Sequence, residues 1–140
     1  IEYPRPSQQL VIDWQARSGL LVAVLPPPYN QQAPAEANER PPGEPIGYIS
    51  LSMERAPATT WITDILVRRR LRRQGIGSAL ILAALEWAAE HESRSVVMDL
   101  QTKNHPAIRL AQKMGFNFTG YMDHFYLNGD IALFFAKAVW

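Results

Sequence analysis

The stretch ILVRRRLRRQGIGSAL (residues 65–80) changes character twice along its length. It begins as the end of a β-branched strand, continues with five arginines among six residues, and ends in two glycines followed by an apolar helical run. Glycines two residues apart permit positive φ and a close approach of the backbone to a ligand. Their N–H groups, together with the free N–H groups of the first helical turn, form a concave site for an anion. Arginines beside the turn add forked donors suited to phosphate oxygens, so the stretch predicts a cradle for a diphosphate.

The composition is that of one globular domain covering residues 1–140, with 47% apolar and 19% charged residues. The net charge is only +1, so the basic character is local and we do not expect a nucleic-acid partner. The chain has no cysteine, which removes disulfides, thiolate metal sites and a cysteine nucleophile. No apolar run approaches the roughly 20 residues that span a bilayer, and no signal peptide is visible. We therefore expect a cytoplasmic protein without a membrane partner. Because the chain opens on Ile1, a truncated N-terminal part is left open.

The remaining sequence predicts an α/β (α+β) chain. Apolar and β-branched runs predict strands at residues 20–25, 46–53, 59–67 and 95–100, and two last strands within 117–127 and 130–139. The sequence NGD (128–130) is a hairpin signal between the last two. Helical patterns cover residues 8–17, 78–91 and 105–114, the last with Asn104 as its cap and Gly115 at its end. Residues 26–45 hold seven of the eleven prolines and predict an irregular surface loop inside the sheet.

Two motifs in a fixed order carry a resemblance to a known family. The order V-x-x-x-x-R-x-x-G-x-G follows a strand at Val67, and the segment NHPAIRLAQKMGF (104–116) follows the next strand. Together they resemble the GNAT superfamily of acetyl-CoA-dependent N-acetyltransferases, over roughly residue 46 to the C-terminus. The second segment matches that family's helix motif at Asn104, Ala107, Leu110, Lys113, Gly115 and Phe116.

The resemblance implies a mixed, mostly antiparallel sheet of six to seven strands, flanked by helices. Its central strands, residues 59–67 and 95–100, would splay apart to admit the pantetheine arm of CoA. Backbone groups of Leu66 and Val67 would pair with that arm like an added strand, and one of their N–H groups would polarise the thioester carbonyl. Asn104 would contact the arm from the other side. The pyrophosphate would bind the N–H groups of Arg72, Arg73, Gln74, Gly75, Ile76, Gly77 and Ser78.

One position departs from the family motif. Ala111 stands where the family usually has a tyrosine that protonates the CoA thiolate. A thiol has a pKa of about 8.5, so its thiolate leaves without much help near neutral pH. Tyr126, Tyr121 or His124 could replace the missing acid, directly or through water.

A general base is a stricter requirement, because a lysine-like amine with a pKa of about 10.4 is almost wholly protonated at pH 7. Asp99 and Asp64, one on each splayed strand, are the candidates. Each could instead be a strand-end carboxylate that pairs with an arginine.

These features favour an N-acetyltransferase that moves acetyl from acetyl-CoA to a primary amine by direct attack in a ternary complex. The absence of cysteine fits, because direct transfer needs no acyl-enzyme. The three histidines lack metal-site spacing, so we expect no metal. The acceptor, a small molecule or a protein amine, stays open, as does a homodimer. Two alternatives are a non-catalytic CoA-binding regulatory or interaction module, suggested by Ala111, and a nucleic-acid-binding domain that uses the arginine run.

Overall fold

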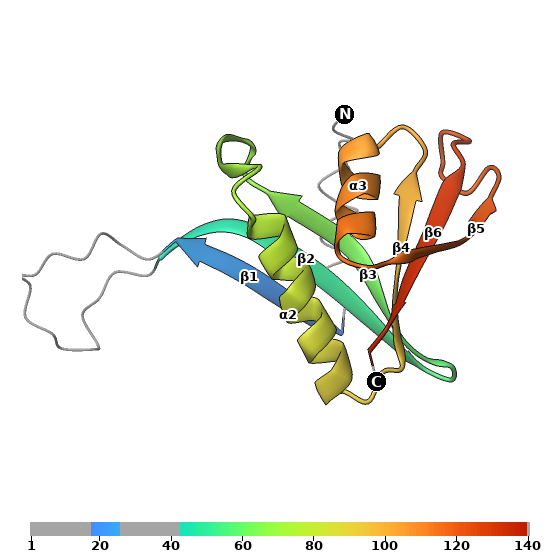
Figure 1. The fold of residues 1–140 in the computed structure, drawn as a ribbon, viewed down its shortest axis with the longest axis horizontal. Coiled ribbons are helices and arrows are strands. Elements are labelled where there is room, and N and C mark those ends of the chain that lie inside the picture. The colour runs from blue at the N-terminus through green and yellow to red at the C-terminus, as the bar shows by residue number, and fades with distance from the viewer. Residues whose placement is uncertain (1–17, 26–42, 140) are drawn as a thin grey trace, which may run out of the picture.

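The computed structural model describes residues 18–25 and 43–139, which form one six-stranded sheet flanked by helices (Figure 1). The strand order is β1-β2-β3-β4-β6-β5. Only β3 and β4 run parallel, and the other neighbours are antiparallel. This confirms the mixed, mostly antiparallel sheet expected from the sequence. The strands are β1 (Gly19–Leu25), β2 (Glu44–Arg55), β3 (Ala58–Val67), β4 (Ser95–Gln101), β5 (Asn117–Met122) and β6 (Ala132–Ala138).

The helices are α2 (Ile76–Glu90) and α3 (His105–Lys113), with a short 3₁₀ turn η1 (Arg69–Leu71) before α2. Both α-helices cover the same face of the sheet (Figure 1). The side chain of Asn104 accepts a hydrogen bond from Ala107 N at 3.3 Å and caps α3 as predicted. Gly115, at a φ of 84°, follows the end of α3 as expected. No helix of the described segments is long and apolar enough to cross a membrane.

The hydrophobic core lies between this sheet face and the two helices. In β4 the buried residues Val96, Met98 and Leu100 alternate with half-buried ones, as expected for a strand with one core face. In α2 the buried residues recur at helical spacing. The core cluster comprises Ile49, Leu51, Ile62, Leu80, Ile81, Ala84, Ala88, Val96, Met98, Leu100, Ala111, Phe116 and Phe135. The other sheet face is therefore where polar side chains of β2, β3 and β4 can gather.

The connection between β5 and β6 is longer than the sequence predicts. The expected strand over residues 117–127 ends at Met122, and residues 123–131 form a loop. His124 adopts a φ of 52°, a left-handed conformation that interrupts the strand. The NGD turn lies inside this loop, where Phe125 N and Tyr126 N approach Asp130 O at 3.2 and 3.4 Å. The loop, rather than a strand, therefore carries Tyr126.

The predictions for the N-terminal third concern mostly residues outside the described ranges. The expected helix over 8–17 lies outside them, as do residues 26–42 of the proline-rich segment. The predicted end of the proline-rich loop at residue 45 is wrong, because Glu44 and Pro45 belong to β2 and pair with Leu25 and Val24 of β1.

Candidate active site

The central strands β3 and β4 pair over only part of their length. Residues 59–62 of β3 pair with residues 95–98 of β4, and no pairing follows. Beyond this point β3 continues to Val67 along β2, and β4 continues to Gln101 along β6. The splayed strand pair predicted from the sequence is thus confirmed. Past this point the facing edges of β3 and β4 do not pair with each other. We call this unpaired region the slot, because an extended ligand could bind its backbone groups like an added strand.

A β-bulge at Thr63 lies where the slot begins. Leu51 pairs with Ile62, but the next residue of β2, Ser50, pairs with Asp64, so Thr63 is an extra residue in β3. The Thr63 hydroxyl donates to Ser50 O at 3.2 Å. Because a bulge shifts the alternation of side chains by one, Asp64 leaves the core face and lies on the opposite face of the sheet.

Each predicted carboxylate accepts a hydrogen bond from a tyrosine. The Tyr126 hydroxyl donates to Asp99 Oδ2 at 2.8 Å, and the Tyr48 hydroxyl donates to Asp64 Oδ2 at 2.7 Å. Both carboxylates are half-buried. Tyr126 is the only hydrogen-bond partner of Asp99 within the described ranges, which leaves Asp99 Oδ1 available to a substrate or a water. The structure therefore brings together Asp99 and Tyr126, two residues that the sequence proposed separately.

The other candidates for the missing acid lie elsewhere. Tyr121 is 69% exposed on β5, the edge strand. The ring of His124 is exposed, with Nε2 at 3.9 Å from Asp123 Oδ1. Ala111 is fully buried in the core, on α3. Of the three candidates, Tyr126 alone hydrogen-bonds a carboxylate of the splayed strands in the described part of the chain.

The glycine turn has the local geometry of an anion cradle. Arg73 and Gly75 both have positive φ, at 65° and 84°, and Gly75 is the N-cap of α2. The first main-chain hydrogen bond of α2 runs from Ala79 N to Gly75 O at 3.0 Å. The N–H groups of residues 76–78 precede it and have no intrahelical acceptor. Unpaired N–H groups at a helix N-terminus are a favourable environment for a phosphate.

The two glycines of the cradle serve different purposes. Gly75 needs its left-handed backbone, and a Cβ added there would meet no atom within 4 Å. Gly77 instead permits close packing between helices, because a Cβ added there would lie 3.3 Å from Leu110 Cδ2 of α3. A side chain at position 77 would therefore disturb the two helices that carry both sequence motifs.

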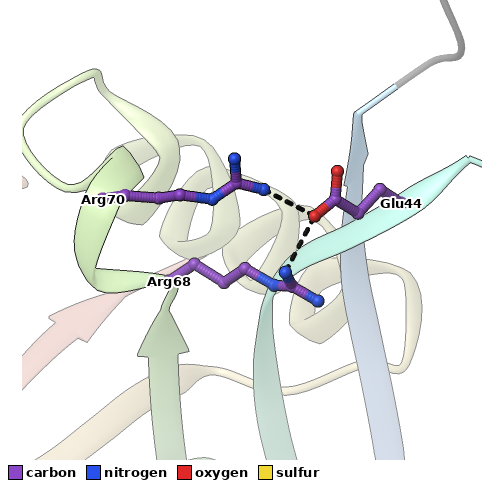
Figure 2. A network of polar contacts seen from close by, with 3 residues as sticks. All are labelled: Glu44, Arg68 and Arg70. Carbon is purple, nitrogen blue, oxygen red and sulfur yellow. Dashed lines mark hydrogen bonds and ion pairs between the residues drawn. The ribbon is translucent and has the colours of Figure 1, made fainter.

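The arginine run divides into two groups. Arg72 lies at the start of the glycine turn, and its Nε donates to Val67 O at 3.1 Å. Arg68 Nη1 and Arg70 Nη2 both donate to one atom, Glu44 Oε1, at 2.8 and 2.6 Å (Figure 2). All three side chains are partly exposed, from 43% to 62%. The run is therefore more than a solvated basic face, because two of its members converge on a single carboxylate oxygen.

Two residues of this region were missed by sequence reasoning, Tyr48 and Glu44. Each lies on β2 and meets its partner only through the β2–β3 pairing. The register of the β2–β3 hairpin is what would have revealed these two residues, because it places Tyr48 opposite Leu66 and brings the start of β2 next to Arg68. That register includes the bulge at Thr63, which no residue pattern in the sequence predicts.

A sheet that opens between two central strands, with a glycine cradle beside the opening, is the architecture that the sequence resemblance implies for acetyl-CoA-dependent acyltransferases. The model of the acetyltransferase (GNAT) family matches residues 2–116. The chain therefore belongs to the GNAT acetyltransferase family.

Three similar proteins illustrate this relationship. An N-alpha-acetyltransferase of Sulfurisphaera tokodaii is 30% identical over 105 residues, which cover 67% of this chain and 63% of the relative. A putative [ribosomal protein bS18]-alanine N-acetyltransferase of Bacillus subtilis is 33% identical over 73 residues, which cover 51% of this chain and 48% of the relative. The crystal structure of a Bacillus subtilis acetyltransferase in complex with CoA superimposes with a TM-score of 0.74 at 19% identity, covering 96% of this chain and 86% of the other, and shows a shared fold. The chain spans less than two thirds of the length of both sequence relatives.

Proposed function

We propose that the protein transfers acetyl from acetyl-CoA to a primary amine by direct attack in a ternary complex, and that the acceptor is the N-terminal α-amine of a protein. The observation that carries this proposal is the slot between β3 and β4, which begins next to the Asp99–Tyr126 pair and lies beside the anion cradle. One sequence relative is named an N-alpha-acetyltransferase and the other a putative [ribosomal protein bS18]-alanine N-acetyltransferase, and these names support this acceptor class.

The backbone at the slot fits the donor. Arg68 N donates to Ile46 O at 2.8 Å, so the N–H of Arg68 points toward β2. Because peptide groups alternate in direction along a strand, Leu66 faces β2 as well, whereas Val67 faces the slot. Of the two residues expected to hold the pantetheine arm, we therefore assign the direct contact to Val67. The N–H groups of residues 72–78 would hold the diphosphate, and Asn104 would contact the arm from α3. Acetyl-CoA supplies the thioester that the amine attacks.

Asp99 is the better candidate for the base. Its Oδ2 accepts from Tyr126, and its Oδ1 has no partner in the described residues. We propose that Asp99 accepts the proton that the amine loses as the N–C bond forms, directly or through one water. An α-amine has a pKa of about 8, against about 10.4 for lysine. A larger fraction of an α-amine is therefore neutral at pH 7, and a carboxylate base is sufficient to remove its proton. Asp64, with Tyr48, would then shape the acceptor pocket.

Departure of the CoA thiolate requires less catalytic assistance than deprotonation of the amine does. The C–S bond breaks as the tetrahedral intermediate collapses, and a backbone N–H group that faces the slot would stabilise the oxyanion before that step. We propose that the Tyr126 hydroxyl, which is held at Asp99, gives the thiolate a proton and is reprotonated from Asp99. Tyr126 would thereby perform the role of the family tyrosine, whose position is occupied by Ala111 in this chain. A thiolate with a pKa of about 8.5 also leaves unaided at a useful rate.

A panel of acceptors tests the proposal. Free thiol is measured with acetyl-CoA and peptides that begin with alanine, serine or methionine, and each peptide is paired with a version whose α-amine is blocked but whose lysine is free. We expect thiol release and a mass increase of one acetyl group only with free α-amines. Turnover on the blocked peptides alone would overturn the proposed acceptor.

A second candidate function, a CoA-binding module without chemistry, is favoured by the burial of Ala111 in place of an acid. Calorimetry with acetyl-CoA separates the two functions. Binding without thiol release across peptides, small amines and polyamines would favour the module.

A further inference from the structure

The cradle and the slot account for two parts of CoA and leave a third unassigned. The N–H groups of residues 72–78 suit the diphosphate, and the slot suits the pantetheine arm. CoA carries one more strongly charged group, the 3′-phosphate, a phosphomonoester with a charge of about −1.5 to −2 at neutral pH. The Arg68–Arg70–Glu44 cluster (Figure 2) has no part in the function proposed above.

This cluster lies beside the cradle in both sequence and space. Arg68 follows Val67 directly, and Arg70 lies in η1, the turn that leads from β3 into the cradle. The backbone of Arg68 is fixed to β2 by its hydrogen bond to Ile46 O. The guanidinium groups of Arg68 and Arg70 are therefore carried by the segment that leads directly into the turn where a diphosphate would bind.

The cluster already holds an anion in the manner of a phosphate site. One oxygen, Glu44 Oε1, accepts from both guanidinium groups, as a phosphate oxygen would. Each guanidinium uses one of its five N–H donors in these bonds. Two positive charges face one negative charge, so the cluster keeps an excess positive charge that favours a dianion over a carboxylate.

Stability does not explain this arrangement. The three side chains are 43% to 62% exposed, and ion pairs at that exposure contribute little to folding. The same exposure makes the guanidinium groups accessible to a ligand. The carboxylate can therefore exchange with a stronger anion at small cost to the fold.

We propose that Arg68 and Arg70 form a subsite for the 3′-phosphate of CoA, and that Glu44 occupies this subsite until the phosphate displaces it. The inference rests on the proposed use of acetyl-CoA. It gives the protein a preference for CoA over 3′-dephospho-CoA that the cradle alone does not supply. Glu44 weakens that preference, because the phosphate must compete with it.

Calorimetry with CoA and with 3′-dephospho-CoA tests this proposal on the whole chain. We expect CoA to bind the unaltered protein about tenfold more tightly. Arg68→Ala and Arg70→Ala should each reduce that ratio, and the double variant should bring it close to one while leaving the dephospho-CoA affinity unchanged. Glu44→Gln should tighten CoA binding by about two- to fivefold and leave dephospho-CoA binding unchanged. Arg55→Ala and Glu54→Gln, at the other end of β2, are matched controls that should alter neither affinity.

The outcomes that overturn the proposal are distinct. Equal affinities for the two ligands in the unaltered protein would exclude the subsite while leaving the proposed acetyl transfer intact. Equal losses for both ligands in the arginine variants would assign these residues to the diphosphate instead. Weaker CoA binding by Glu44→Gln would show that Glu44 positions the arginines rather than competing for them. If the unaltered protein bound neither ligand, the proposed function would fail, and this subsite with it. Inorganic phosphate should compete with CoA only in the millimolar range; competition as strong as that of CoA would indicate a general phosphate site.

Discussion

Replacing Asp99 with asparagine tests the proposed base with little disturbance of the fold. The Tyr126 hydroxyl donates to Asp99 Oδ2 at 2.8 Å, and the amide oxygen of asparagine can accept the same bond. The exchange of a charged acceptor for a neutral one should cost about 1 kcal/mol of unfolding free energy or less. What the variant loses is basicity. General acid–base groups contribute about 10²- to 10⁴-fold, so kcat for an α-amine peptide should fall by that factor, or about 3 to 5 kcal/mol of activation free energy.

Asp64→Asn is the matched comparison, because Asp64 also accepts from a tyrosine, Tyr48, at 2.7 Å. We expect its kcat to change by less than about threefold, since it removes a charge from the pocket and not the base. Steady-state thiol release gives kcat for each variant, and calorimetry checks that acetyl-CoA affinity is unchanged. Raising the pH toward about 8 supplies neutral amine without the protein, so the deficit of Asp99→Asn should shrink. An Asp99→Asn enzyme that keeps a third of its kcat, or an Asp64→Asn enzyme that loses as much, would refute the assignment.

Three further predictions concern the two motifs. Gly77→Val should weaken CoA binding by tenfold or more in calorimetry and lower the unfolding free energy by about 1–3 kcal/mol, because its side chain must displace Leu110; an unchanged CoA affinity would count against the cradle. Asn104→Ala removes the cap of α3 and should lower the unfolding free energy by about 1 kcal/mol in urea, with Asn104→Ser recovering most of it. Ala111→Tyr should destabilise the fold by at least about 1–3 kcal/mol without raising kcat, because the position is fully buried; a faster, stable variant would show that the family acid can be restored.

Much of the fold was predictable from local patterns. The glycine turn, the cap at Asn104 and the alternating β4 sequence each fix their own element through interactions within a few residues. The helix expected at 78–91 begins two residues earlier, at Ile76, because Gly75 already provides the cap. The last hairpin was less well predicted, since positive φ at His124 ends the strand pairing in a way that its side chain does not indicate.

The candidate site was only partly predictable, because its pairs form across strands. Counting back from the β2–β3 turn places Ser50 opposite Thr63, and that register would point Asp64 into the core. The bulge moves the register by one residue and so creates the Tyr48–Asp64 pair. The Asp99–Tyr126 bond likewise depends on the fold of a nine-residue loop, residues 123–131. Residue types identified the candidates, and only the tertiary register could match them.

The short pairing between β3 and β4 also links ligand occupancy to the integrity of the fold. Four residue pairs join two three-stranded half-sheets, with α2 packed against strands of both. An extended ligand in the slot would complete the missing ladder and lock the halves together. Because it would bind only the folded chain, it would stabilise the native state by RT ln(1 + [L]/Kd). The cellular level of the acyl donor would then set not only how fast such a protein works but also how long each copy survives proteolysis.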